Sequence, residues 1–168
     1  YFDLKTVIEA AKILSKDDGI GFLLAGDGSH LVSYKELARS VKSCQFPGWL
    51  SREEILGVMH KSSLGLAPYK LGARMTMPNK PFEYMAGGLP IVTSLKGELT
   101  EELLRHEAGM AYVANKPEDL AEKIKYLRNH PDICQRMGQN SKKLFNDRYS
   151  IDVVFREAQN HIERIHEF

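Results

Sequence analysis

The sequence predicts an α/β fold, a Rossmann-like three-layer sandwich in which helices cover both faces of a mostly parallel sheet. Short apolar segments of strand length alternate with segments of helical periodicity from residue 4 to residue 113, and only helical periodicity follows. Strands that alternate with helices are joined by crossover connections, which give parallel pairing. At 168 residues the chain has room for a hydrophobic core, and we expect residues 1–168 to form one domain.

The expected strands are short apolar or β-branched runs, and most of them end at a turn or a loop. The first is a continuous apolar run ended by Gly26-Asp27-Gly28, and the second leads into the turn Pro47-Gly48-Trp49. In chain order these strands cover residues 20–25, 44–46, 63–68, 90–94 and 109–113.

The expected helices are identified by their caps and by apolar residues at helical spacing. Asp3 caps the first helix, and Ser51–Glu54 is a capping box for a helix that we expect to bury Ile55, Leu56 and Met59. Everything after the last strand is helical, and Ser150 caps the final helix. Between the strands, helices are expected near residues 4–14, 31–40, 52–60, 79–87 and 98–106.

The carboxyl ends of the expected strands should form the ligand-binding edge, because ligands of open parallel sheets bind outside those ends. The segments that follow the strands should therefore converge on one rim. These segments are Gly26–Gly28, Pro47–Trp49, Tyr69–Met77 and the loop after Thr93.

Composition excludes several classes of protein. A net charge of +1 gives no reason to expect nucleic acid as a partner. Cys44 and Cys134 lack any CxxC spacing and are interpreted as reduced, buried thiols of a cytosolic protein. The six histidines are scattered without metal spacing, so we expect no metal site and no bound cofactor. The sequence shows no membrane span and no signal peptide.

The most informative segment is residues 77–94, where a helix begins in a loop and leads into a buried strand. With Asn79 as the N-cap after Pro78, Lys80 and Glu83 share one helix face. The helix N-terminus and Lys80 suit a diphosphate, and Glu83 could accept hydrogen bonds from a ribose diol. A solvated Lys–Glu pair on an exposed face explains the same pattern equally well.

Gly26 and Trp49 are weaker candidates on the same rim. Gly26 opens a GxG sequence, which favours a tight turn over close approach of a ligand by about two to one. Trp49 is the single tryptophan and could edge a nucleobase pocket, although a core position for its ring is slightly favoured.

The order of motifs resembles the C-terminal, nucleotide-sugar-binding domain of GT-B fold, retaining glycosyltransferases, the glycosyl transferases group one. The matching segments begin with GxG at Gly26 and continue through Phe-x-Gly-Trp-Leu-Ser-Arg-Glu-Glu-Ile and Leu-Gly-Leu-Ala-Pro. The most specific is Glu-x-Met-Ala-x-Gly-x-Pro-Ile-Val, starting at Glu83. The likeness covers nearly the whole chain.

The resemblance implies roles for several positions. Glu83 matches the family glutamate that binds the ribose of the donor. The family's other glutamate, which contacts the transferred sugar, falls at Met75 in this chain, so this sequence has no counterpart for that contact. A family lysine falls near Phe2, and a family arginine falls before Tyr1. The resemblance therefore implies that the first strand and the N-terminal acceptor domain lie outside this sequence. Our hypothesis is that Lys80 supplies some of the lost positive charge.

The function implied by the resemblance is retaining, hexosyl-type transfer from a nucleotide-diphosphate sugar to a glycan or lipid-linked acceptor, as in polysaccharide biosynthesis. The implied location is cytoplasmic, with peripheral association of the full-length protein at the inner face of the membrane. No residue of this chain is assigned to catalysis, and the chain alone is expected to be inactive.

Two alternatives share this architecture. A nucleotide-sugar 2-epimerase needs carboxylates and histidines around the sugar, and residues 69–77 contain none. A non-catalytic nucleotide-binding module needs only the fold. A dinucleotide dehydrogenase is disfavoured, because GxG lacks its third glycine and no acidic residue ends the strand near Phe46.

Overall fold

The computed structural model describes residues 1–16 and 19–166, with side chains described as far as residue 164. It confirms the Rossmann-like arrangement, in which every paired strand is parallel to its neighbour. The strands are β1 (Phe22–Ala25), β2 (Cys44–Gly48), β3 (Gly65–Ala67), β4 (Ile91–Thr93) and β5 (Gly109–Ala111). Among the described residues they form two sheets, one with the order β1-β2 and one with the order β3-β4-β5.

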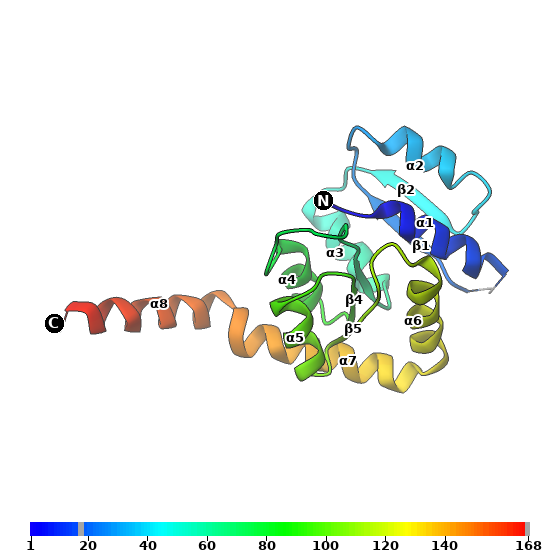
Figure 1. Cartoon of the computed structure of the whole chain (residues 1–168). Helices are drawn as coiled ribbons and strands as arrows, with labels where there is room; N and C mark the ends of the chain where they lie inside the picture. Colours follow the sequence, from blue (N-terminus) through cyan, green and yellow to red (C-terminus); the bar gives the residue numbers. More distant parts are fainter. Residues whose placement is uncertain (17–18, 167–168) are drawn as a thin grey trace.

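Helices connect the strands in the expected alternation (Figure 1). The first five are α1 (Leu4–Ile13), α2 (Leu31–Leu37), α3 (Arg52–Lys61), α4 (Asn79–Ala86) and α5 (Glu98–Arg105). A short 3-10 turn, Leu14–Lys16, extends α1. After β5 come α6 (Pro117–Asn129), α7 (Pro131–Leu144), the π-helical turn η2 (Phe145–Tyr149) and α8 (Ile151–His166).

The central strand β4 separates the two halves of the hydrophobic core. Its side chains are fully buried and point alternately to opposite faces, as the period of a strand requires. Val92 packs with the buried residues of α1 and α6, whereas Ile91 packs with Met85 of α4 and Leu99 of α5. A strand covered on both faces is typical of a parallel sheet between two helix layers.

The caps predicted at two helix starts are present. Asp3 accepts hydrogen bonds from the backbone N–H of Thr6 (3.2 Å) and from its hydroxyl (2.5 Å) at the start of α1. Ser51 and Glu54 form the reciprocal capping box of α3, with N···O distances of 3.2 Å and 2.8 Å. These contacts satisfy backbone donors that a helix start leaves open.

Four expectations need correction. The single expected sheet is divided between β2-β1 and β3-β4-β5. Pro47 and Gly48 are the last residues of β2 rather than a turn, which proline tolerates because β2 is an edge strand. The N-cap of α4 is Pro78, and Asn79 is its first helical residue. Leu56 of α3 is 51% exposed, because this helix packs on its neighbours through Ile55 and Met59, which are half-buried.

Helix α8 projects away from the rest of the chain (Figure 1). Its side chains Ile151, Val154, Phe155 and Ile162 are exposed, although its apolar residues recur at helical spacing. The helix therefore carries an amphipathic face that the described part of the chain does not cover.

The close approach of Gly109 to the backbone of β4 leaves no room for a side chain, and this gives a stability prediction. A Cβ at this position would lie 2.2 Å from the carbonyl oxygen of Ile91, a backbone atom of the central strand. We expect Gly109→Ala to lower the free energy of unfolding by about 1–3 kcal/mol, because the clash cannot be relieved by a side-chain rotation. Urea denaturation measures the change.

Gly57→Ala is the matched control for Gly109→Ala. A Cβ on Gly57, inside α3, meets nothing within 4 Å, and alanine favours a helix over glycine by about 1 kcal/mol. The control should be neutral or stabilising. Equal destabilisation by the two substitutions would contradict the assigned packing of β4 against β5.

Candidate functional site

The carboxyl ends of the strands meet in pairs, as expected for the rim of a parallel sheet. At the ends of β1 and β2, the N–H of Gly26 donates to the carbonyl of Gly48 over 2.6 Å, and both glycines have positive φ. At the ends of β3 and β4, the Ser94 hydroxyl contacts both the N–H and the carbonyl of Tyr69 at 2.8 Å. Positive φ favours glycine at both Gly26 and Gly48, and at Gly26 this supports the tight-turn interpretation.

The first residues of the chain lie against the same rim. The N–H of Asp3 donates to the carbonyl of Pro68 (2.8 Å), and the N–H of Lys70 donates to the carbonyl of Tyr1 (3.0 Å). Phe2 forms an isolated antiparallel bridge with Tyr69. The backbone before α1 is thereby held beside the carboxyl end of β3.

Helix α4 begins with an open N-terminus. Its N-cap is Pro78, whose side chain makes no capping hydrogen bond, and Pro81 in the first turn carries no N–H. The amides of Asn79 and Lys80 are therefore the donors at this end of the helix, where the helix dipole favours an anion. Pro81 and Met85 are buried and fix the opposite side of α4 to the core.

Lys80 and Glu83 share a face of α4, as predicted. The ammonium of Lys80 lies 2.9 Å from a carboxylate oxygen of Glu83, and the side chains are 47% and 43% exposed. An exposed i,i+3 pair of this kind contributes at most about 1 kcal/mol to stability, so either group can exchange its partner for a ligand at little cost. Both line a cavity of about 1220 Å³ that extends between β1 and β3.

The structure places the other candidate residues around this site without bringing all of them together. Pro78 and Asn79 begin α4, and neither they nor Gly26 and Trp49 are among the residues that line the cavity. Trp49 is 71% exposed at the end of β2, so the interpretation of its ring as a core residue is wrong. Met75 is half-buried and packs against the core cluster of α4 and α5.

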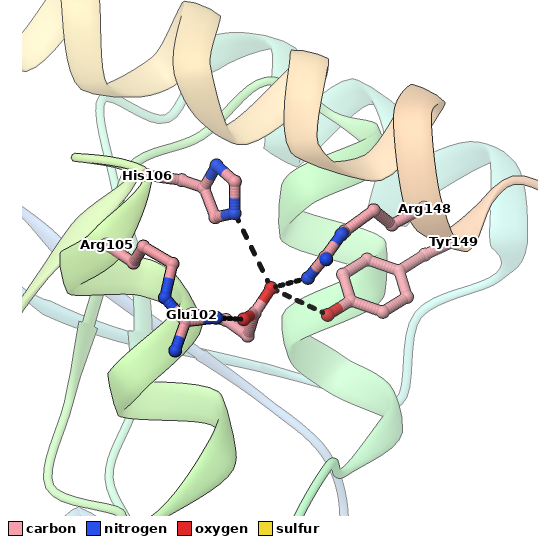
Figure 2. Close-up of polar contacts among 5 residues, drawn as sticks. All are labelled: Glu102, Arg105, His106, Arg148 and Tyr149. Atoms are coloured by element: carbon pink, nitrogen blue, oxygen red, sulfur yellow. Dashed lines mark hydrogen bonds and ion pairs between the residues drawn. The ribbon is translucent and has the colours of Figure 1, made fainter.

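A buried carboxylate that sequence reasoning missed lies on α5 (Figure 2). One oxygen of Glu102 accepts a hydrogen bond from Arg105 (2.6 Å). The other oxygen accepts one from Arg148 of η2 and lies 3.5 Å from the Tyr149 hydroxyl and 3.6 Å from His106. The network joins α5 to the π-helical turn from which α8 departs. Its sequence signal is a glutamate on the buried stripe between Leu99 and Leu103.

The partners of Glu102 keep it ionised. Burial alone would raise the pKa of its carboxyl, but the hydrogen bond and charge of Arg148, with the charges of Arg105 and His106, outweigh burial and lower that pKa. The same contact raises the pKa of Arg148. The ion pairs therefore stabilise the join between α5 and η2 at neutral pH, and this cluster has the character of a structural anchor.

The described residues contain no group of three or more histidine, cysteine, aspartate or glutamate side chains that could hold a metal ion. Within the same described part of the chain, no helix has both the length and the apolar character needed to cross a membrane.

Comparison with protein families identifies a family model that covers most of the chain. The family model described as glycosyl transferases group 1 matches residues 3–144. Among curated proteins, an uncharacterized glycosyltransferase of Methanocaldococcus jannaschii is 29% identical over 141 residues, which is 80% of this chain and 38% of that protein. A glycogen synthase of Mycobacterium tuberculosis is 23% identical over 133 residues, 74% of this chain and 30% of that protein. The chain thus spans about a third of the length of these relatives.

Solved structures share the fold at low sequence identity. The C-terminal domain of a glycosyl transferase group 1 family protein (LpcC) from Francisella tularensis has a TM-score of 0.75 and 21% identity, with 88% of this chain and 80% of that chain covered. HepE of Anabaena, solved in complex with UDP-glucose, has a TM-score of 0.78 and 16% identity, with 95% and 44% covered. These likenesses confirm the Rossmann-like fold of the GT-B type.

The lowered pKa of Glu102 predicts loss of stability in acid. A carboxyl whose pKa is lower in the folded state stabilises the fold above its ordinary value of 4.5. That contribution is lost as the pH falls below this value and through the folded-state pKa. We expect Glu102→Gln to lower the free energy of unfolding by about 1–3 kcal/mol at pH 7. The difference from wild type should shrink below pH 4.5, as urea denaturation across pH would measure.

Glu101→Gln is the matched control, because Glu101 precedes Glu102 on the same helix but is exposed. It should change stability by no more than about 0.5 kcal/mol at any pH. A Glu102→Gln effect that is independent of pH would contradict the assigned role of the ionised carboxylate.

Proposed function

Because the chain belongs to the glycosyl transferases group 1 family, we propose that it binds a nucleotide-diphosphate sugar as the donor half of a glycosyltransferase. The observation that carries this proposal is the N-terminus of α4, where Lys80 and Glu83 line one cavity. The backbone N–H groups of Asn79 and Lys80 donate to no side chain of the N-cap residue, which leaves them free to donate to a ligand.

Each group has a chemical role in this proposal. The helix N-terminus and the Lys80 ammonium bind the diphosphate, since both favour negative charge. Glu83, one turn along the helix, accepts hydrogen bonds from the ribose hydroxyls. Its present partner is Lys80 at 2.9 Å, and both side chains are exposed enough to turn toward a ligand.

The proposed reaction is transfer of a hexosyl group with retention at the anomeric carbon. The bond from that carbon to the diphosphate breaks, and a bond to the oxygen of an acceptor hydroxyl of a glycan or lipid-linked sugar forms. The hydroxyl proton passes to the departing diphosphate or to solvent. Negative charge develops on the departing diphosphate, so Lys80 and the α4 amides stabilise the transition state electrostatically. No residue of this chain is assigned to the acceptor, and we expect no turnover by this chain alone.

The solved relatives support a nucleotide sugar as the donor, because HepE was solved with UDP and with UDP-glucose. A cytoplasmic protein of polysaccharide biosynthesis, with peripheral association at the membrane, fits the same family resemblance. The alternatives of a 2-epimerase and of a non-catalytic module receive no specific support from residues at the rim.

A nucleotide panel tests the proposal. The natural full-length protein and this chain would be titrated calorimetrically with UDP, GDP, ADP and CMP, and with the matching nucleosides. Glu83→Ala should weaken binding of the preferred nucleotide about 10- to 100-fold, because hydrogen bonds to a charged group contribute about 1.5–3 kcal/mol. Lys80→Ala should weaken binding of the diphosphate while leaving the nucleoside unchanged, since its role is electrostatic.

The matched control is Glu36→Ala, which breaks the i,i+3 pair between Glu36 in the last turn of α2 and Arg39 just after that helix (3.3 Å). This pair has the same spacing but lies away from the cavity. Glu36→Ala should therefore leave the affinity for the nucleotide unchanged. Full binding by Glu83→Ala, or an equal loss of diphosphate and nucleoside in Lys80→Ala, would refute the assigned roles.

A further inference from the structure

The N-terminal turn of α4, residues 79–82, has no local cap to hold it. Pro78 makes no capping hydrogen bond, and the turn contains no acidic side chain that could accept from its open amides. Helix ends of this kind fray unless their side chains pack against other parts of the molecule. The direction of the open amides therefore depends on the tertiary contacts of α4.

Helix α7 fixes the other end of α4. The ammonium of Lys142 donates to the carbonyl of Ala86. Gly138 of α7 approaches Gly88, just after α4, so closely that a Cβ on Gly138 would lie 2.4 Å from the Gly88 carbonyl oxygen. These contacts lie about two turns away from the open amides, so they do not by themselves fix the start of the helix.

The start of α4 packs on η2 through a pair of aromatic rings. Phe82 of α4 and Tyr149 of η2 meet edge to face, with ring centroids 5.0 Å apart and an angle of 68° between the ring planes. Rings in this arrangement attract each other, because the positive edge of one faces the negative face of the other. Phe82 lies between Lys80 and Glu83 in the sequence of the helix, so a movement of its ring moves both.

Tyr149 is itself held by contacts to α5 and within η2. Its hydroxyl lies 3.5 Å from a carboxylate oxygen of Glu102, and the preceding residue, Arg148, binds the same oxygen (Figure 2). Burial, and then the charge of Glu102, raise the pKa of Tyr149, so the hydroxyl stays protonated beside that carboxylate. The N–H of Ser150 donates to the carbonyl of Phe145 over 2.9 Å and closes the π-helical turn, a geometry that is frequent at functional sites.

We propose that Tyr149 is a positioning residue of the ligand site at α4. Its ring holds Phe82, and through Phe82 it holds the first turn of the helix, so that the open amides and Lys80 point together at a bound diphosphate. The effect is indirect, because Phe82 and Tyr149 are not among the described residues that line the cavity of Lys80 and Glu83. The identity of the ligand rests on the proposed function, whereas the hold on the helix start does not.

Nuclear magnetic relaxation tests the hold on the helix start without any ligand. Tyr149→Leu keeps most of the apolar volume of the side chain but removes the aromatic ring. In the natural full-length protein, this substitution should lower the backbone order parameters of Asn79 and Lys80 from about 0.85, the value of rigid backbone, toward about 0.6. The order parameter of Gly87, beside the carbonyl that Lys142 binds, should not change. Order parameters report motion within the folded state, so a lower free energy of unfolding alone leaves them unchanged.

Nucleotide affinity tests the consequence for binding. Calorimetric titration would use whichever of UDP, GDP, ADP and CMP the wild type binds most tightly. Tyr149→Leu and Phe82→Leu should each weaken binding by about 2- to 10-fold, the factor that corresponds to the energy of an edge-to-face ring pair. Because Tyr149 acts through Phe82, the double variant should bind no more weakly than Phe82→Leu alone.

Two controls separate positioning from general packing. Tyr149→Phe keeps the ring and should match the wild type in both measurements. Tyr126→Leu removes a ring of α6, in the opposite helix layer from α4, that stacks on His130 at 4.3 Å between centroids. This substitution should also leave the order of the α4 start and the nucleotide affinity unchanged.

Unchanged order at Asn79 and Lys80, or unchanged nucleotide affinity, in Tyr149→Leu would overturn the inference. Additive losses of affinity in the double variant would overturn it as well, since Tyr149 would then act by a route other than Phe82. A wild type that binds none of the four nucleotides, but in which Tyr149→Leu still disorders the start of α4, would refute the proposed function and support the positioning role.

Discussion

The burial of β4 on both faces is the constraint on which the rest of the structure depends. Val92 and Ile91 point to opposite helix layers, so each layer is positioned by the same short strand. Thr93, at its carboxyl end, donates its hydroxyl to the carbonyl of Ala67 (3.0 Å) and accepts from the N–H of Leu95 (3.1 Å). These contacts join β4 to the end of β3. The loop that leads to α4, and hence the open helix N-terminus, begins at that joined edge.

The contacts of Glu102 connect the core to the C-terminal part of the chain. Helix α5 follows β4 directly, and Glu102 on its buried face binds Arg148 of η2. The π-helical geometry of η2 lets Arg148 and Tyr149 reach the same carboxylate, and Tyr149 also packs edge-on against Phe82 of α4 at 5.0 Å between ring centroids. The direction in which α8 leaves the domain is therefore set by contacts to both α4 and α5.

Much of the fold could be predicted from the sequence because helix caps and apolar runs are local patterns. Caps at Asp3 and Ser51, and the apolar runs of the strands, depend on a few neighbouring residues. The exposure of Trp49 and the pairing of Glu102 with Arg148 depend on residues far away in sequence, so local patterns could not predict them. The separation of β1 from β3 is likewise a property of pairing between distant strands. The spacing of Lys80 and Glu83 did predict their shared face, since it is a local property of a helix.

Exposure to water determines how strongly the charges of Lys80 and Glu83 interact with each other or with a ligand. At 47% and 43% exposure their charges are screened, and two unit charges in bulk water at this range interact by only about 1 kcal/mol. The same charges act more strongly when protein replaces water around them, because the effective dielectric constant falls. A ligand that fills the cavity they line would displace water from it and so have this effect. The strength of the proposed diphosphate site therefore depends on one physical variable, the amount of water beside the N-terminus of α4.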